Sequence, residues 1–307
     1  MIKYFSYRFI WWFISALPKS VAYSLAKSTG NLIYRQNGKG VQRLRNNYLV
    51  VKPNLSSDDL EKLTKDGVIS YWRYWCDTFR LNKWSKSQII ETVSVTNEHL
   101  LVDSVNQKLG CLVALPHAGN WDHAGAYFCQ IGIPLTTVAE KLEPEKIFLK
   151  FLDYRQQIGM EILNHKEKTI PTLTERLKQG KLVALVADRD LSKSGVEVKF
   201  FGKTAKMPAG PALLWLDTNC KFITAFVSYT ETGIHVQFDE IRNDLKTFIS
   251  KYPRTHKIVL NNPKYNKYLN GDEMDYKIGI AMSSYRHNKA KKLLFKLLEN
   301  RIEYWWT

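Results

Sequence analysis

Residues 111–122 read Cys-Leu-Val-Ala-Leu-Pro-His-Ala-Gly-Asn-Trp-Asp. The first five residues are all apolar, which is typical of a strand that is buried on both faces of a sheet. Pro116 ends this strand, Gly119 permits a tight turn, and Asn120 is a good N-cap for a helix that follows. The stretch therefore predicts a strand–turn–helix unit of an α/β fold.

The same alternation of apolar runs and helical patterns continues to about residue 240. Further strands are expected at 134–139, 182–187 and 222–227, with an edge strand at 233–238. Helices are expected at 120–130, 144–158 and 170–179, and a long earlier one begins at the N-cap cluster 56–59. Strands that alternate with helices predict an α/β fold with a mixed, mostly parallel central sheet flanked by helices.

The 307 residues carry a net charge of +16, and the N-terminus is more uniformly basic than the rest. Residues 1–57 contain nine cations, many aromatic residues and no acid. The apolar run 9–14 is far shorter than the roughly 20 residues that span a bilayer, and no signal-peptide cleavage site follows it. We expect N-terminal amphipathic helices that lie in the interface of an anionic membrane. The alternative is a helix packed on the domain with a solvated basic side.

Nucleic-acid binding and metal binding fit the sequence less well than membrane binding does. Nucleic acid also attracts basic surfaces, but no helix-turn-helix, RNP or zinc-finger signature is present, so no nucleic acid is expected as a partner. The four cysteines form no C-x-x-C pair, which argues against a metal site and against a disulfide framework. We expect a single domain over 1–307, with membrane-binding helices at 1–57, a catalytic core at 58–240 and a divergent basic region at 241–307. The last region holds a hard-to-read segment at 241–290 and a basic amphipathic helix at 289–306.

His117 and Asp122 are the candidate catalytic pair. His117 lies directly after the buried strand, where open α/β sheets place their ligands. If its ring folds back toward Asp122, the carboxylate accepts the Nδ1 hydrogen and Nε2 becomes an available base. Spacing alone is weak support, since His235 and Glu240 have the same spacing on a predicted strand and are interpreted as a coincidence. The alternative for His117 is a structural turn histidine held by Asn120.

At this point the sequence resembles a family. The stretch PHAGNWDHAGA at 116–126 is similar to the bacterial membrane-associated lipid acyltransferases, the superfamily of the lipid A late acyltransferases. Within it, the blocks at 138–142, 154–161 and 187–211 look most like the phosphatidylinositol mannoside acyltransferases. The resemblance covers roughly residues 1–228 and fades after 241.

The resemblance implies transfer of a fatty acyl group from acyl-CoA to a mannose hydroxyl of a phosphatidylinositol mannoside. It implies no cofactor and no metal, and a peripheral enzyme on the cytoplasmic face of the cell membrane. His117 would remove the proton from the sugar hydroxyl while Asp122 orients His117. A related alternative is another glycolipid acceptor, such as a lipid A precursor, with acyl carrier protein as the donor. A thioesterase that uses the same dyad with water is a third alternative.

Four further residues are expected at the substrate. Glu140 and Glu197 are suited to accept hydrogen bonds from sugar hydroxyls, although either could be a solvated loop acid. Arg155 could pair with one of these acids, steady an anionic oxygen or lie on the surface. Arg189 is one of several cations near Glu197 that could meet phosphates of CoA or inositol.

Overall fold

The structure is a computed structural model, and it describes residues 2–139, 145–164, 169–190 and 195–240. The predicted segment at 241–290, the predicted helix at 289–306 and the candidate residue Glu140 lie outside these ranges.

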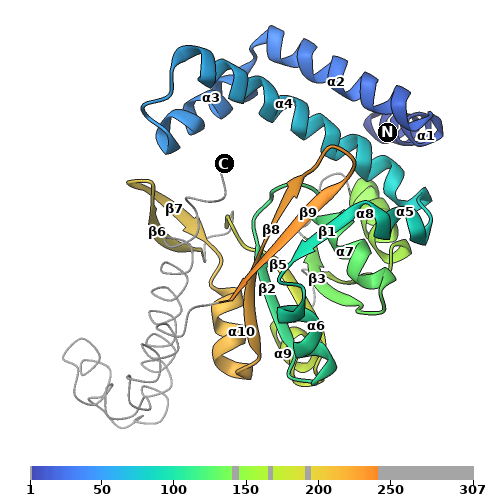
Figure 1. The fold of residues 1–307 in the computed structure, drawn as a ribbon, viewed down its shortest axis with the longest axis vertical. Coiled ribbons are helices and arrows are strands. Elements are labelled where there is room, and N and C mark those ends of the chain that lie inside the picture. The colour runs from blue at the N-terminus through green and yellow to red at the C-terminus, as the bar shows by residue number, and fades with distance from the viewer. Residues whose placement is uncertain (1, 140–144, 165–168, 191–194, 241–307) are drawn as a thin grey trace. The chain divides into compact units, whose positions relative to one another are not determined.

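Seven strands form one sheet in the order β1-β9-β8-β2-β5-β3-β4, and β6 pairs with β7 in a separate two-stranded sheet (Figure 1). The strands are β1 (Val93–Thr96), β2 (Cys111–Leu115), β3 (Leu135–Ala139), β4 (Glu161–Asn164), β5 (Leu182–Val186), β6 (Val196–Phe200), β7 (Lys203–Met207), β8 (Lys221–Tyr229) and β9 (Ile234–Glu240). The pairs β1·β9, β8·β2, β2·β5 and β3·β4 are parallel. Residues 230–233 join β8 to β9, and so short a connection requires an antiparallel pair. The prediction of a mixed, mostly parallel sheet is confirmed.

One prediction about the sheet was wrong. The strand at 233–238 was expected at the edge, but β9 is the second strand, and β1 lies outside it with Val93 opposite Ile234. The cause is that β9 alternates buried and more exposed residues, a pattern that any strand with one covered face shows. The four residues of β1 gave too short a pattern to be recognised.

Helices α1 to α5 precede the first strand of the sheet, and the later helices alternate with the strands and flank the sheet. They are α1 (Ile2–Ala16), α2 (Lys19–Gln36), α3 (Lys39–Val51), α4 (Ser57–Arg80), the 3₁₀ turn η1 (Leu81–Lys83), α5 (Lys86–Glu91), α6 (His99–Asn106), α7 (Trp121–Gln130), α8 (Glu145–Gln157), α9 (Thr169–Lys178) and α10 (Gly210–Thr218). The predicted helix starts agree closely: Ser56 caps α4 by accepting a hydrogen bond from the amide of Asp59 at 3.1 Å. Gly159 and Gly180 follow α8 and α9 with φ of +99° and +79°, the conformation expected after a helix end.

The described chain divides into two compact units, each assembled from several stretches of sequence. The described part of unit 1 comprises residues 2–96, 117–139, 145–164, 169 and 227–237. In it α1, α2 and α3 pack against α4, α1 also meets α8, and α5 packs on α7. The described part of unit 2 comprises residues 97–116, 170–190, 195–226 and 238–240, and in it α6 and α10 pack against β2. The division of the chain into functional regions at residues 57 and 240 stays a prediction.

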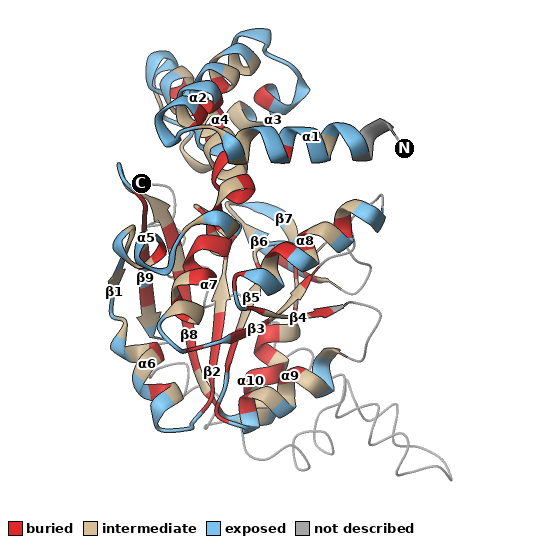
Figure 2. Cartoon of the chain, turned by 90° about the vertical axis from the view of Figure 1, so that its right-hand side faces the viewer, coloured by how far each residue is buried: buried red, intermediate tan, exposed pale blue. Residues whose placement is uncertain are grey.

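Helix α1 has two unlike faces. Trp11 is only 5% exposed and packs its ring against three other aromatic rings at centroid distances of 5.1–5.5 Å, those of Phe79, Phe151 and Tyr154. Phe5, Phe9 and Trp12 are each 61% exposed. Figure 2 shows this exposed surface continuing along α1. In the part of the chain that the structure describes, no helix combines the length and the apolar character that crossing a bilayer demands.

Candidate active site

The turn between β2 and α7 has a conformation that its sequence requires. Gly119 has φ of +57°, and a Cβ atom there would lie 2.4 Å from the backbone oxygen of Val227. Any side chain would therefore be strained and would also clash. Asn120 caps α7, because its Oδ1 accepts a hydrogen bond of 3.0 Å from the amide of His123. Both predictions for this turn are confirmed, and together they fix the path of the chain beside His117.

His117 is exposed and is held beside an aromatic pair. Its ring meets the ring of Trp121 edge-on, with centroids 5.0 Å apart and planes at 84°. Trp121 in turn stacks on Tyr74 of α4 at 4.7 Å with planes at 25°. Aromatic contacts of this kind contribute about 1 kcal/mol each beyond simple burial. The imidazole is thus positioned by packing on one side and is open to solvent on another.

Asp122 is buried in an ion pair with Arg155 from the last turn of α8. Nε of Arg155 donates to Oδ1 of Asp122 at 2.8 Å, and Nη2 lies 3.4 Å from Oδ2. The Asp122 side chain is 2% exposed and that of Arg155 is 18% exposed. Burial alone lowers the pKa of Arg155, but the charge of Asp122 and its hydrogen bond outweigh this and raise that pKa. The guanidinium supplies the opposite charge that a buried carboxylate needs.

The structure therefore gives Arg155 a partner that the sequence did not indicate, since its expected partners were Glu140 and Glu197. A hydrogen bond between Asp122 and the His117 ring stays a prediction. What the structure brings together in unit 1 is His117, Trp121 and Asp122 on one turn, with Tyr74 and Arg155 from two other helices.

The other predicted site residues lie in unit 2 or outside the described ranges. Glu197 is exposed in β6, opposite Lys206 of β7. Arg189 is exposed and follows β5 by three positions. Glu140 lies outside the described residues. Substrate binding by these three residues stays a prediction.

Sequence reasoning missed two residues of this site, Tyr74 and His123. Tyr74 lies in a stretch dense in aromatic residues, 71–75, and that density was the available signal. His123 follows Asp122 and is 1% exposed; its Nε2 lies 3.1 Å from Oγ1 of Thr92, and its ring meets Trp84 edge-on at 5.1 Å. Burial lowers the pKa of His123 to about 4, so it is neutral at physiological pH and is a structural residue rather than a second base.

The described residues do not meet the requirements of a metal site. Among those residues, no group of three or more His, Cys, Asp and Glu side chains is placed to hold a metal ion.

The described chain is thus an α/β protein with an exposed histidine directly after a strand, where open α/β sheets bind their ligands, and a buried carboxylate five positions further on. Comparison with known families identifies the particular family. The family model described as bacterial lipid A biosynthesis acyltransferase matches residues 1–246, and the chain belongs to this family.

Two relatives carry more specific names. A phosphatidylinositol mannoside acyltransferase of Mycolicibacterium smegmatis is 36% identical over 211 residues, which are 68% of this chain and 69% of the relative. A phosphatidylinositol mannoside acyltransferase of Mycobacterium tuberculosis H37Rv is 37% identical over 222 residues, which are 69% of this chain and 68% of the relative. The family resemblance predicted from the motifs is confirmed.

Proposed function

We propose that this protein transfers a fatty acyl group from acyl-CoA to a mannose hydroxyl of a phosphatidylinositol mannoside. The observation that carries the proposal is the identity of 36–37% to relatives named for this acceptor, over 68–69% of the chain. The exposed imidazole of His117, five positions before the buried Asp122, supports the choice of His117 as the base.

In the proposed reaction His117 acts as a general base. Nε2 of its ring takes the proton of the mannose hydroxyl while the sugar oxygen attacks the thioester carbonyl carbon. The tetrahedral intermediate then collapses, the carbon–sulfur bond breaks, and the imidazolium returns its proton to the CoA thiolate. Asp122 orients the ring and stabilises the imidazolium, as the carboxylate of a His–acid dyad does. The products are the acylated glycolipid and free CoA, so atoms and charge balance without a cofactor.

The remaining predicted residues have roles at the two substrates. Glu140 and Glu197 accept hydrogen bonds from sugar hydroxyls, and Arg189 pairs with phosphate oxygens of CoA or of the inositol lipid. The exposed position of Glu197 and Arg189 is compatible with such contacts. Arg155 acts through Asp122 as a positioning residue, which follows from their ion pair.

The protein is proposed to work at the cytoplasmic face of the cell membrane as a peripheral enzyme. Support comes from α1, whose Phe5, Phe9 and Trp12 side chains are each 61% exposed, and from nine cations without an acid in residues 1–57. Aromatic residues that flank cations favour the headgroup region of an anionic bilayer.

A second candidate acceptor is a lipid A precursor, and the description of the matched family, which names lipid A biosynthesis, favours this acceptor. The donor would then be acyl carrier protein. The test is an acyl-transfer assay in which each donor is combined with each acceptor, with the acylated lipid separated by thin-layer chromatography. We expect product only from acyl-CoA with the mannolipid. Product only from acyl carrier protein with the lipid A precursor would establish the second candidate instead. Release of CoA at the same rate without any acceptor would indicate a thioesterase.

A further inference from the structure

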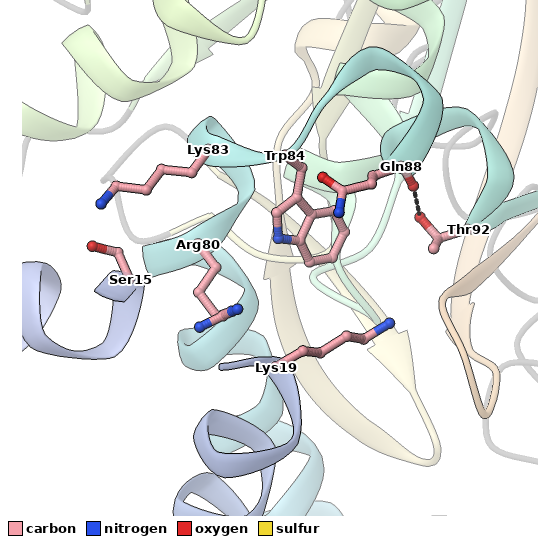
Figure 3. Close-up of a pocket in the computed structure, with 7 residues that line it drawn as sticks. All are labelled: Ser15, Lys19, Arg80, Lys83, Trp84, Gln88 and Thr92. Atoms are coloured by element: carbon pink, nitrogen blue, oxygen red, sulfur yellow. Dashed lines mark hydrogen bonds between the residues drawn. The ribbon is translucent and has the colours of Figure 1, made fainter. Parts of the chain in front are cut away.

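Unit 1 contains a cavity of about 270 Å³ where the end of α1, the start of α2 and the segment from α4 to β1 come together (Figure 3). Its wall includes three cationic side chains, Lys19, Arg80 and Lys83. The other lining residues are a serine, a tryptophan, a glutamine and a threonine, so none of the described residues that line it is an acid. Pockets for small ligands begin at roughly 300 Å³, so this cavity suits a headgroup-sized anion rather than a whole lipid.

Arg80 is held at this cavity by the fold, whereas Lys19 and Lys83 are exposed lysines at its rim. Nη1 of Arg80 donates to the backbone oxygens of Ile14 and Leu17, which ties the guanidinium to the end of α1. Nε of the same guanidinium is buried and has no hydrogen-bond partner among the described residues. A buried donor without a partner costs about 1–3 kcal/mol, and like charges around one cavity also repel each other. The buried Nε is out of reach of a ligand, but an anion with oxygen acceptors would offset the repulsion between the like charges.

The start of α2 adds positive potential to the same place. Lys19 is the first residue of this 18-residue helix, and Pro18 before it provides no side-chain cap. A buried acid on α4, Asp77, accepts a hydrogen bond from Tyr23 and lies 3.9 Å from Nε of Arg73, and it also interacts electrostatically with Lys19 and Arg80. This one carboxylate balances only part of the positive charge of Lys19, Arg80 and Lys83, and a bound anion would balance the rest.

The proposed membrane attachment supplies a source for the anion. Ser15, which lines the cavity, belongs to the same helix as the exposed rings of Phe9 and Trp12. A bilayer that this helix binds would present a layer of lipid phosphates at the helix. On the other side of the cavity, Trp84 and Thr92 line it and also contact His123, the neighbour of Asp122 on α7.

We propose that the Lys19–Arg80–Lys83 cavity binds the phosphate of an anionic phospholipid headgroup, by charge-assisted hydrogen bonds from its three cations. This inference rests on the proposed membrane attachment. A headgroup held there would dock the N-terminal helices on the bilayer in one orientation and would brace the α5–α7 contact that supports the His117 turn.

The test compares three proteins that differ in where charge is removed. The pocket variant is Lys19→Gln with Lys83→Gln. The control variant is Lys27→Gln with Lys39→Gln, which removes the same charge from lysines on α2 and α3 that are exposed like Lys19 and Lys83 but do not line the cavity. Co-sedimentation is measured with phosphatidylcholine vesicles that contain or lack phosphatidylinositol. In parallel, the thermal unfolding midpoint is measured with soluble glycerophosphoinositol and with inorganic phosphate alone.

We expect the pocket variant to bind phosphatidylinositol vesicles about tenfold more weakly than the control variant, because only the pocket cations form directed hydrogen bonds. Glycerophosphoinositol should stabilise the wild type and the control variant but not the pocket variant. Equal weakening of both variants would mean diffuse attraction and would overturn the proposal. Stabilisation by inorganic phosphate alone, with equal vesicle binding of both variants, would show a free-phosphate site and would also overturn it. If the wild type does not bind these vesicles, membrane attachment is refuted as well. The acyl-transfer assay tests the proposed reaction separately.

Discussion

His117 and Asp122 are separated by five positions, and so are His235 and Glu240, yet the two pairs lie in unlike surroundings. The first pair spans a turn and the start of a helix. Its histidine is exposed beside Trp121, and its acid is buried against Arg155. The second pair lies along β9. His235 is hydrogen bonded through its ring nitrogens to the hydroxyls of Ser94 and Thr96, and Glu240 forms an ion pair with Lys221.

Backbone conformation explains the difference. Five steps along an extended strand separate two residues by roughly 16 Å and turn them to opposite faces of the sheet. A turn with Gly119 at positive φ, followed at once by a capped helix, instead changes the direction of the chain between His117 and Asp122. Equal spacing therefore carries little information about chemistry until the local backbone is known.

The largest expected effect is on catalysis by the first histidine. His117→Ala should lower the rate of acyl transfer by about 10³-fold or more, because the general base is removed. The free energy of unfolding should fall by only about 1 kcal/mol, since the exposed side chain gives up its ring contact with Trp121. The measurement is a steady-state acyl-transfer assay together with a thermal melt of the same preparation.

The matched control for that variant is His235→Ala. It removes a histidine with two hydroxyl partners on β1, so it should lower stability by about 1 kcal/mol and leave the rate of transfer unchanged. Equal rates for the two variants, whether both are active or both are inactive, would contradict the distinction drawn between the pairs.

Much of the backbone around the His117–Asp122 pair could be predicted from local sequence. The apolar run at 111–115, Gly119 and the cap at Asn120 act over a few residues, so composition and spacing were sufficient to place them. The same holds for the amphipathic N-terminal helices.

The contacts that define the surroundings of the site could not be predicted in this way. Arg155 meets Asp122 across 33 positions, and Tyr74 meets Trp121 across 47. A single sequence gives no register between helices that are so far apart, because each residue type has many possible partners. The strand β1 was missed for a related reason, since its identity depends on pairing with β9 and not on its own four residues.

The second effect concerns the two ion pairs, that of Asp122 with Arg155 and that of Glu240 with Lys221. Arg155→Met should lower the free energy of unfolding by about 3–5 kcal/mol, because it leaves the Asp122 carboxylate buried without an opposite charge. Lys221→Met removes the partner of Glu240, whose side chain is 45% exposed, and should cost at most about 1 kcal/mol. Urea unfolding of both variants at neutral pH measures the difference, and similar losses would show that Asp122 does not depend on Arg155.

The third effect is the pH dependence of stability that comes from His123, which is buried, whereas His117 is exposed. Because burial lowers the pKa of His123 to about 4, the folded state resists a proton that the unfolded state accepts near pH 6.5. Stability contributed by the neutral ring is therefore present above pH 6.5 and is lost as the pH falls toward 4, by about 3 kcal/mol. His123→Gln lacks this loss.

The measurement is the difference in free energy of unfolding between wild type and His123→Gln at pH 7 and at pH 4. Burial also raises the pKa of Asp77 to about 6, so that acid makes the protein less stable as the pH rises through the same range. This opposite contribution is present in both proteins and cancels in the difference. A difference that does not change with pH would mean that His123 is already protonated in the folded protein or remains solvated.

The smallest expected effect tests whether the turn itself accounts for the contrast between the two pairs. Gly119 and Gly132 both have positive φ, +57° and +90°, but a Cβ at Gly132 would meet no atom of the described residues within 4 Å. Gly132→Ala should therefore cost only the backbone strain, about 1 kcal/mol. Gly119→Ala adds a clash with a backbone oxygen that cannot move away alone, and should cost about 2–3 kcal/mol. It should also slow acyl transfer at temperatures where the variant is fully folded, because His117 is two residues away and would shift with the turn. If both variants lose the same stability and keep full activity, the backbone at Gly119 does not set the position of His117, and the aromatic contact with Trp121 must do so by itself.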